Sequence, residues 1–130
     1  MPATIKCREE IQDQIIEQVI NELIEVLEPL DLDLDWENDE SLEDVVSESV
    51  VATDKGIKVK FPVGDVYCDD VYEYVDAIVE IFKNLKSSYP DIAIQRGSVY
   101  VEDKYDEEYK HGYKFSCTEK DTDLNVKSYM

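Results

Sequence analysis

The residues best suited to chemistry lie in one acidic run, "PLDLDLDWENDESLEDVV", from Pro29 to Val46. Closely spaced carboxylates are the ligands that calcium prefers, and a calcium-binding loop needs them at fixed positions around a central glycine. The best frame runs from Asp33 to Asp44, but Glu40 occupies the usually apolar eighth position and Asp44 is shorter than the usual final glutamate. The run therefore predicts weak, non-specific attraction of divalent cations, and we expect no defined metal or cofactor site.

Catalytic residue types are sparse. His111 is the single histidine, and in "EEYKHGYKF" beside a glycine it is expected in a surface turn. Cys68 precedes a predicted helix, whose N-terminus would lower the pKa of the thiol, but Asp65, Asp69 and Asp70 oppose that effect. Cys68 is therefore expected to be a buried structural thiol. The sequence contains no phosphate-binding glycine loop and no nucleophile-elbow motif, so we predict no catalytic residues and no enzymatic activity.

Charge dominates the composition. The chain has 130 residues, 43% of them hydrophobic, and a formal net charge of −19. Residues 29–54 contain ten acidic residues and no basic ones, so over half of the net charge lies in a fifth of the chain. Such a surface repels nucleic acid and anionic membranes, which excludes both as direct partners. The expected partner is a basic protein.

The cysteines and the N-terminus indicate the compartment. Cys7, Cys68 and Cys117 are odd in number, far apart and form no CxxC motif, which is typical of a reducing environment. The first ten residues, "MPATIKCREE", lack the apolar segment of a signal peptide, and no apolar run reaches membrane-spanning length. We therefore expect a cytoplasmic protein.

The elements that position these residues follow from hydrophobic periodicity. A long amphipathic helix is predicted from about Thr4 to Glu28, where Pro29 stops it, and its apolar stripe is wide enough to serve a homodimer as readily as a core. A short helix is expected after Ser41, and a second long helix from about Asp69 to Lys86. Predicted strands are Val50–Thr53 and Ile57–Val63, joined by a turn, then Ile92–Gln95, Ser98–Asp103, Tyr113–Thr118 and Leu124–Ser128, with Arg96-Gly97 as a turn or a bulge.

These elements predict one α+β domain over residues 1–130, in the order α-β-β-α-β-β-β, with an antiparallel sheet and two helices packed on one face. Acidic residues on the exposed helix faces would stand roughly 5–6 Å apart, similar to the phosphates of a nucleic-acid strand. Trp36 is expected either to anchor a partner or to plug the acidic run onto the helices. The predicted partner-binding residues are Asp31, Asp33, Asp35, Trp36, Glu37, Asp39, Glu40, Glu43, Asp44, Asp69, Asp70, Glu73 and Asp76, with Glu10, Asp13, Glu17, Glu25, Glu28 and Glu80 extending the helix faces.

Through the run from Asp31 to Asp44 and these helix faces, the chain resembles the small acidic inhibitors of phages and mobile elements: the DNA-mimic, anti-restriction and anti-CRISPR proteins. The resemblance is one of class and implies a non-enzymatic inhibitor that blocks the basic groove of a nucleic-acid-binding enzyme. The chain also resembles toxin-immunity proteins, which implies an immunity or adaptor module in which the Tyr-rich segment 100–113 contributes shape. A divalent-cation-binding domain is the third hypothesis. The predicted elements from about Ile57 to Thr118 also resemble a ferredoxin-like β-α-β-β unit.

Overall fold

The computed structural model describes residues 2–28, 33–34, 42–54, 56–60, 64–65, 68–102 and 110–128. In this described part of the chain, three helices cover one face of a six-stranded antiparallel sheet in the order β3-β4-β1-β6-β7-β8, and β2 pairs with β5 separately. This architecture confirms the predicted α+β class. The elements are β1 (Pro2–Lys6), α1 (Glu9–Leu27), β2 (Asp33–Leu34), α2 (Leu42–Ser49), β3 (Val50–Thr53), β4 (Gly56–Lys60), β5 (Gly64–Asp65), α3 (Cys68–Ser88), β6 (Ala93–Glu102), β7 (Lys110–Cys117) and β8 (Asn125–Ser128).

The first residues correct the sequence-based expectation. A helix was predicted from about Thr4, but Thr4 lies in β1, and α1 begins only at Glu9. Ala3 and Ile5 are completely buried while Lys6 is exposed, which is the period-two pattern of a half-buried strand. The pattern is too short to compete with the strong helical periodicity that follows it. β1 nevertheless lies at the centre of the sheet, between β4 and β6 and antiparallel to both.

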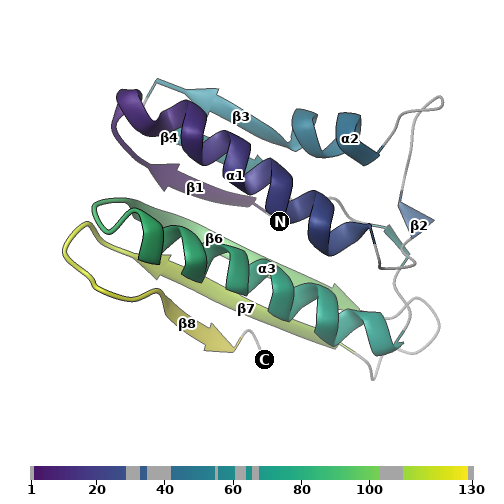
Figure 1. Ribbon diagram of the computed structural model, residues 1–130. Helices are drawn as coiled ribbons and strands as arrows, with labels where there is room; N and C mark the ends of the chain where they lie inside the picture. The colour runs from purple at the N-terminus through teal and green to yellow at the C-terminus, as the bar shows by residue number, and fades with distance from the viewer. Residues whose placement is uncertain are drawn as a thin grey trace.

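The presence of β1, which the sequence did not predict, also changes the topology. The succession β1-α1-β3-β4-α3-β6, with spatial order β3-β4-β1-β6, has the connectivity of a ferredoxin-like split βαβ unit. The expected unit, from Ile57 to Thr118, therefore began too late, because it omitted β1. α1 packs on β3 and β4, α3 packs on β6 and β7, and the two helices contact each other in front of the sheet (Figure 1).

The β3–β4 hairpin is confirmed. Its first strand has the predicted bounds, and the second begins at Gly56, where an added Cβ would lie 1.9 Å from the Ile5 carbonyl oxygen. Gln12 of α1 reinforces the turn, because its Nε2 donates to the carbonyl oxygens of Thr53 at 2.9 Å and Gly56 at 2.6 Å. The hairpin is thus held by the helix that covers it.

The two alternatives at Arg96-Gly97 are also resolved. β6 runs without interruption from Ala93 to Glu102, and its register against β7 shifts between Ile94 and Gly97. Arg96 has a φ of 54°, in the left-handed region that a residue with a Cβ seldom adopts. The strand therefore contains a β-bulge, and Arg96 lies in it.

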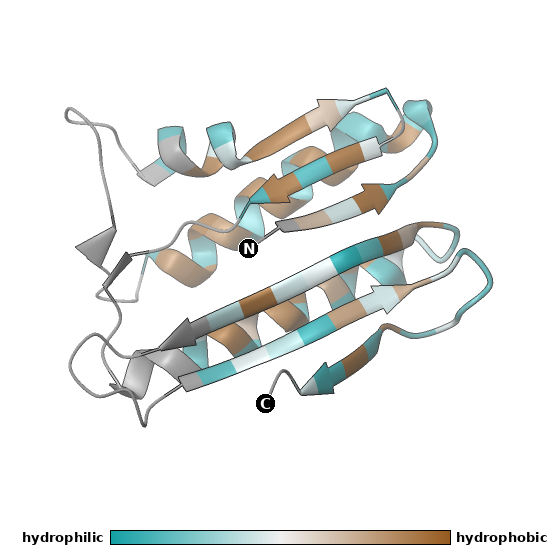
Figure 2. Ribbon diagram, turned by 180° about the vertical axis from the view of Figure 1, so that it is seen from behind, coloured by the Kyte–Doolittle hydropathy of each residue, from teal (hydrophilic) through white to brown (hydrophobic). Residues whose placement is uncertain are grey.

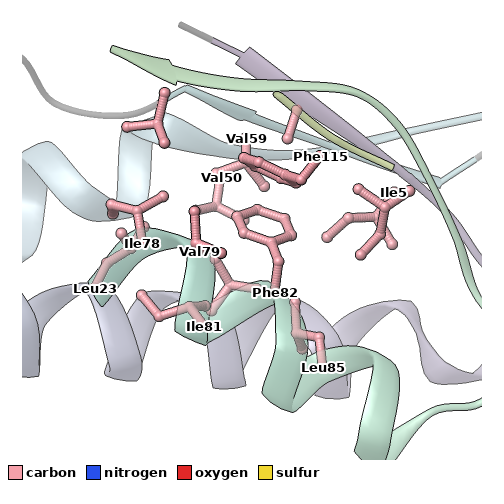
Figure 3. Packing of buried hydrophobic residues seen from close by; sticks show 14 of the residues in the cluster. Ile5, Leu23, Val50, Val59, Ile78, Val79, Ile81, Phe82, Leu85 and Phe115 are labelled. Atoms are coloured by element: carbon pink, nitrogen blue, oxygen red, sulfur yellow. The ribbon is translucent and has the colours of Figure 1, made fainter. Parts of the chain in front are cut away.

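The core lies between the helices and the sheet (Figure 3). Phe82 of α3 and Phe115 of β7 point toward each other, with ring centroids 4.7 Å apart. The Phe115 ring has room because its neighbour across the ladder is Gly97, where an added Cβ would lie 2.3 Å from that ring. Tyr74 of α3 is also buried there, at 1% exposure.

Lys86 is a buried charge near the end of α3, where only 1% of its surface is exposed. Its Nζ donates to the carbonyl oxygens of Pro90 at 2.6 Å, Ile92 at 2.9 Å and Thr118 at 3.0 Å. An ammonium group has three N–H donors, so these three acceptors use all of them. The lysine thereby ties α3 to the start of β6 and to the end of β7.

Candidate interaction surface

The predicted partner-binding residues fall into three groups. Glu43 and Asp44 are exposed on α2, and Glu73 and Asp76 are exposed on α3, as expected. Asp33 lies in β2, and Asp69 and Asp70 lie at the start of α3, where the structure describes only their secondary structure. The remaining residues lie outside the described part of the chain, and this group consists of Asp31, Asp35, Trp36, Glu37, Asp39 and Glu40.

The described helices present a surface of almost one sign. Exposed carboxylates lie along α1, α2 and α3, whereas Lys83 is the one exposed cation among the described residues of these helices. On α1, Glu10, Asp13 and Glu17 follow one another at three- and four-residue steps, which places them on one stripe. We define the acidic helical face by its twelve exposed carboxylates: Glu9, Glu10, Asp13, Glu17, Glu25, Glu28, Glu43, Asp44, Glu48, Glu73, Asp76 and Glu80.

One carboxyl, that of Glu22, lies between the two long helices. Glu22 of α1 has side-chain hydrogen bonds to Gln18 and to Asn84 of α3. Burial raises the pKa of this carboxyl above its ordinary value, and the hydrogen bonds oppose the increase. Its Oε2 atom is buried without a hydrogen-bond partner in the described part of the structure. The fold therefore disfavours the charged form of Glu22.

Asp76 contacts the single histidine. Its Oδ1 lies 3.0 Å from Nε2 of His111, which belongs to β7 and is not in a turn as predicted. The strand accommodates "HG" because Gly112 packs closely against the backbone of Val99. Desolvation, the charge of Asp76 and a hydrogen bond to it all raise the pKa of Tyr113. This polar cluster joins α3 to β7 and orients an otherwise exposed carboxylate of the acidic helical face.

The opposite face of the sheet carries the opposite charge, which the sequence analysis missed. Figure 2 shows this side, which none of the described helices covers. Ile57 and Val59 of β4 face the core, so the exposed Lys58 and Lys60 face outward, and Lys58 pairs in register with Thr4 of β1. We call this side the open sheet face; its exposed cations are Lys6, Lys58, Lys60, Arg96, Lys114 and Lys127. The signal was the lysine at every second position of "GIKVK".

The described residues offer little for metal or thiol chemistry. Among them, no three His, Cys, Asp or Glu side chains lie close enough together to hold a metal ion. Cys7 and Cys117 are free thiols, and burial raises the pKa of each, which disfavours the reactive thiolate. Cys68 is the first residue of α3, and its side chain lies outside the described set. No described helix has the length and apolar character needed to cross a bilayer.

No family model matches the chain, and neither a curated protein nor a solved structure matches it. A function for this chain is therefore argued from its own residues. The described residues separate charge between two faces, with carboxylates on the helices and cations on the open sheet face.

Proposed function

We propose that the chain is a non-enzymatic, cytoplasmic interaction protein whose acidic helical face occupies the basic groove of a nucleic-acid-binding enzyme, such as a CRISPR or restriction nuclease. The observation that carries the proposal is the set of twelve exposed carboxylates on α1, α2 and α3 and just after α1. Neighbouring carboxylates on a helix stand roughly 5–6 Å apart, so the face mimics a row of phosphates. An inhibitor of this kind fits the phage or mobile-element class that the sequence resembles.

The physical basis is the one that binds nucleic acid itself. A groove lined with Lys and Arg attracts counterions, and an acidic ligand of any backbone releases them on binding. The same like-charged face repels itself in the free protein, and a basic partner relieves that repulsion. Binding should therefore be steeply salt-dependent and should exclude the natural nucleic acid.

A second candidate is an immunity or adaptor protein, and the open sheet face favours it. A chain whose two faces differ in sign can bring two different partners together, whereas a simple mimic needs only one face. In that case, shape complementarity would supplement charge, and the complex would survive high salt.

The test is capture of partners from a host-type lysate on the tagged full-length protein, washed first at low and then at high salt. The proposal predicts a nucleic-acid-binding enzyme that elutes with salt and that added nucleic acid displaces. A single partner that resists both salt and nucleic acid would favour the adaptor. Capture of no basic protein would contradict the proposal.

A further inference from the structure

A depression of about 560 Å³ opens between the bulge of β6 and the end of β7. Its lining includes Gln95, Arg96, Ser116 and Lys120, and Lys6 of β1 also lines it. A small-molecule site typically has a volume of roughly 300–1,000 Å³, so this depression is large enough to hold a small ligand. None of its lining residues belongs to the acidic helical face.

The charges around this depression are positive, although the chain as a whole is strongly acidic. Lys6, Arg96 and Lys120 line it, against one carboxylate, Glu119. Within the described part of the chain, no carboxylate forms an ion pair with Lys6, Arg96 or Lys120. The adjoining depression shares Lys6 and Glu119 and adds Arg8 and Asp91, so both arginines of the chain border these two depressions.

The backbone of Arg96 is an independent observation. Its φ of 54° is unfavourable for a residue with a Cβ, and a glycine would adopt it freely. Bulges redirect side chains, and backbone strain of this kind concentrates at ligand-binding positions. The bulge thus places a guanidinium at the depression, although a different residue would suit the backbone better.

We propose that this depression binds a small phosphate-bearing anion. The guanidinium of Arg96 matches two phosphate oxygens at once, and Lys6 and Lys120 add point charges that favour a multivalent anion over a monocarboxylate. The net charge of −19 opposes anions at long range, but salt screens that repulsion beyond about 8 Å at physiological ionic strength. The local cations therefore determine binding. The proposal is independent of any partner of the acidic helical face.

Calorimetric titration of the full chain with sodium pyrophosphate tests this site. We expect saturable binding, and we expect the affinity to fall at least about tenfold in Arg96→Gln, because the two-oxygen contact is lost. The affinity of Arg96→Lys for pyrophosphate should lie between those of the wild type and Arg96→Gln, since lysine keeps the charge and loses the planar guanidinium. A parallel titration with ADP separates the sources: tighter binding than pyrophosphate identifies a nucleotide, and equal or weaker binding identifies a phosphate group alone.

The matched control is Lys60→Gln, which removes one cation from the same open sheet face at a residue that does not line the depression. Its affinity for pyrophosphate should equal that of the wild type. Amide chemical-shift changes on titration should centre on Arg96, Ser116 and Lys120. The proposal is overturned if the wild type shows no saturable binding, or if Lys60→Gln weakens binding as much as Arg96→Gln.

Discussion

The acidic helical face and the open sheet face belong to one small protein but carry opposite charges. Among the described helix residues, every exposed charged side chain is Glu or Asp except Lys83. Among the strand residues whose side chains the structure describes, every exposed charged side chain is a cation, as Lys58 and Lys60 are on β4. A single net charge of −19 hides this separation. Each face can therefore have its own binding properties, which the net charge of the whole chain does not reveal.

The largest effect should come from Lys86, which connects the helical layer to the sheet. We expect Lys86→Met to lower the free energy of unfolding by about 3 kcal/mol, because one buried and two part-buried carbonyl oxygens lose their donor. Urea denaturation at neutral pH measures the change. Lys83→Met, at an exposed position of the same helix, is the control and should change stability little. Equal losses in the two variants would show that Lys86 is not a connection between the layers.

A smaller effect of opposite sign is expected on the open sheet face. Arg96→Gly should raise the free energy of unfolding by about 1 kcal/mol, because glycine adopts a φ of 54° without strain. Arg96→Ala keeps the strain and should leave stability nearly unchanged. Thermal denaturation of the two variants separates backbone strain from the loss of the charge. A destabilised glycine variant would refute the assignment of strain at this bulge.

The smallest effect concerns Glu22, which lies between the two long helices. Its pKa is raised in the folded state, so the fold holds this proton more tightly than the unfolded chain does. The energetic penalty of ionising Glu22 is therefore present above its folded pKa and disappears below its ordinary pKa of 4.5. Glu22→Gln should be slightly more stable than the wild type at neutral pH, and the difference should vanish below pH 4.5.

The control for this prediction is Glu17→Gln, which removes an equal charge from an exposed position of α1. Urea midpoints across the pH range compare the two variants. A gain at neutral pH in Glu17→Gln as large as that in Glu22→Gln would assign the effect to net charge. A pH-independent gain in Glu22→Gln would rule out titration of this carboxyl as its cause.

Most of the fold could be predicted because long periodic segments dominate it. The apolar stripes of α1 and α3 and the alternation along β4 are local patterns, and residues that belong to them, such as Tyr74 and Ile57, are buried in the core. β1 was missed because two buried residues, Ala3 and Ile5, make too short a pattern. His111 was misplaced because a glycine beside it resembles a turn, whereas Gly112 serves close packing between strands.

The candidate surfaces were harder to predict, because a surface is assembled across the chain. The exposed positions of α1 and α3 followed from helical spacing, since one element defines each stripe. The open sheet face joins Lys6, Lys58, Arg96 and Lys127 from four strands, and only the register brings them together. The sequence predicted only that Lys86 lies near a helix end. Its burial could not be predicted, because it depends on contacts with the segments next to β6 and β7.

The central claim is that the acidic helical face binds the partner. A test by charge reversal on this face needs a control variant that changes the net charge by the same amount elsewhere. Reversal of Asp121 would be a poor control, because its Oδ2 accepts the Thr118 N–H at 2.8 Å and Asn125 Nδ2 at 3.2 Å, so it also supports the β7–β8 connection. Asp54, Asp91 and Asp123 are exposed outside the helices and suit the purpose. Reversing all three to Lys changes the net charge as much as reversing Glu10, Asp13 and Glu17.

The most direct measurement is the affinity of the captured partner for these two triple variants at one low salt concentration. The account predicts that the Glu10, Asp13 and Glu17 variant binds about 100-fold more weakly than the wild type, because charge reversal makes attractive contacts repulsive. The Asp54, Asp91 and Asp123 variant should stay within about threefold of the wild type, since only the long-range field changes. Equal weakening in both variants would contradict the claim and would reduce the binding to net charge alone.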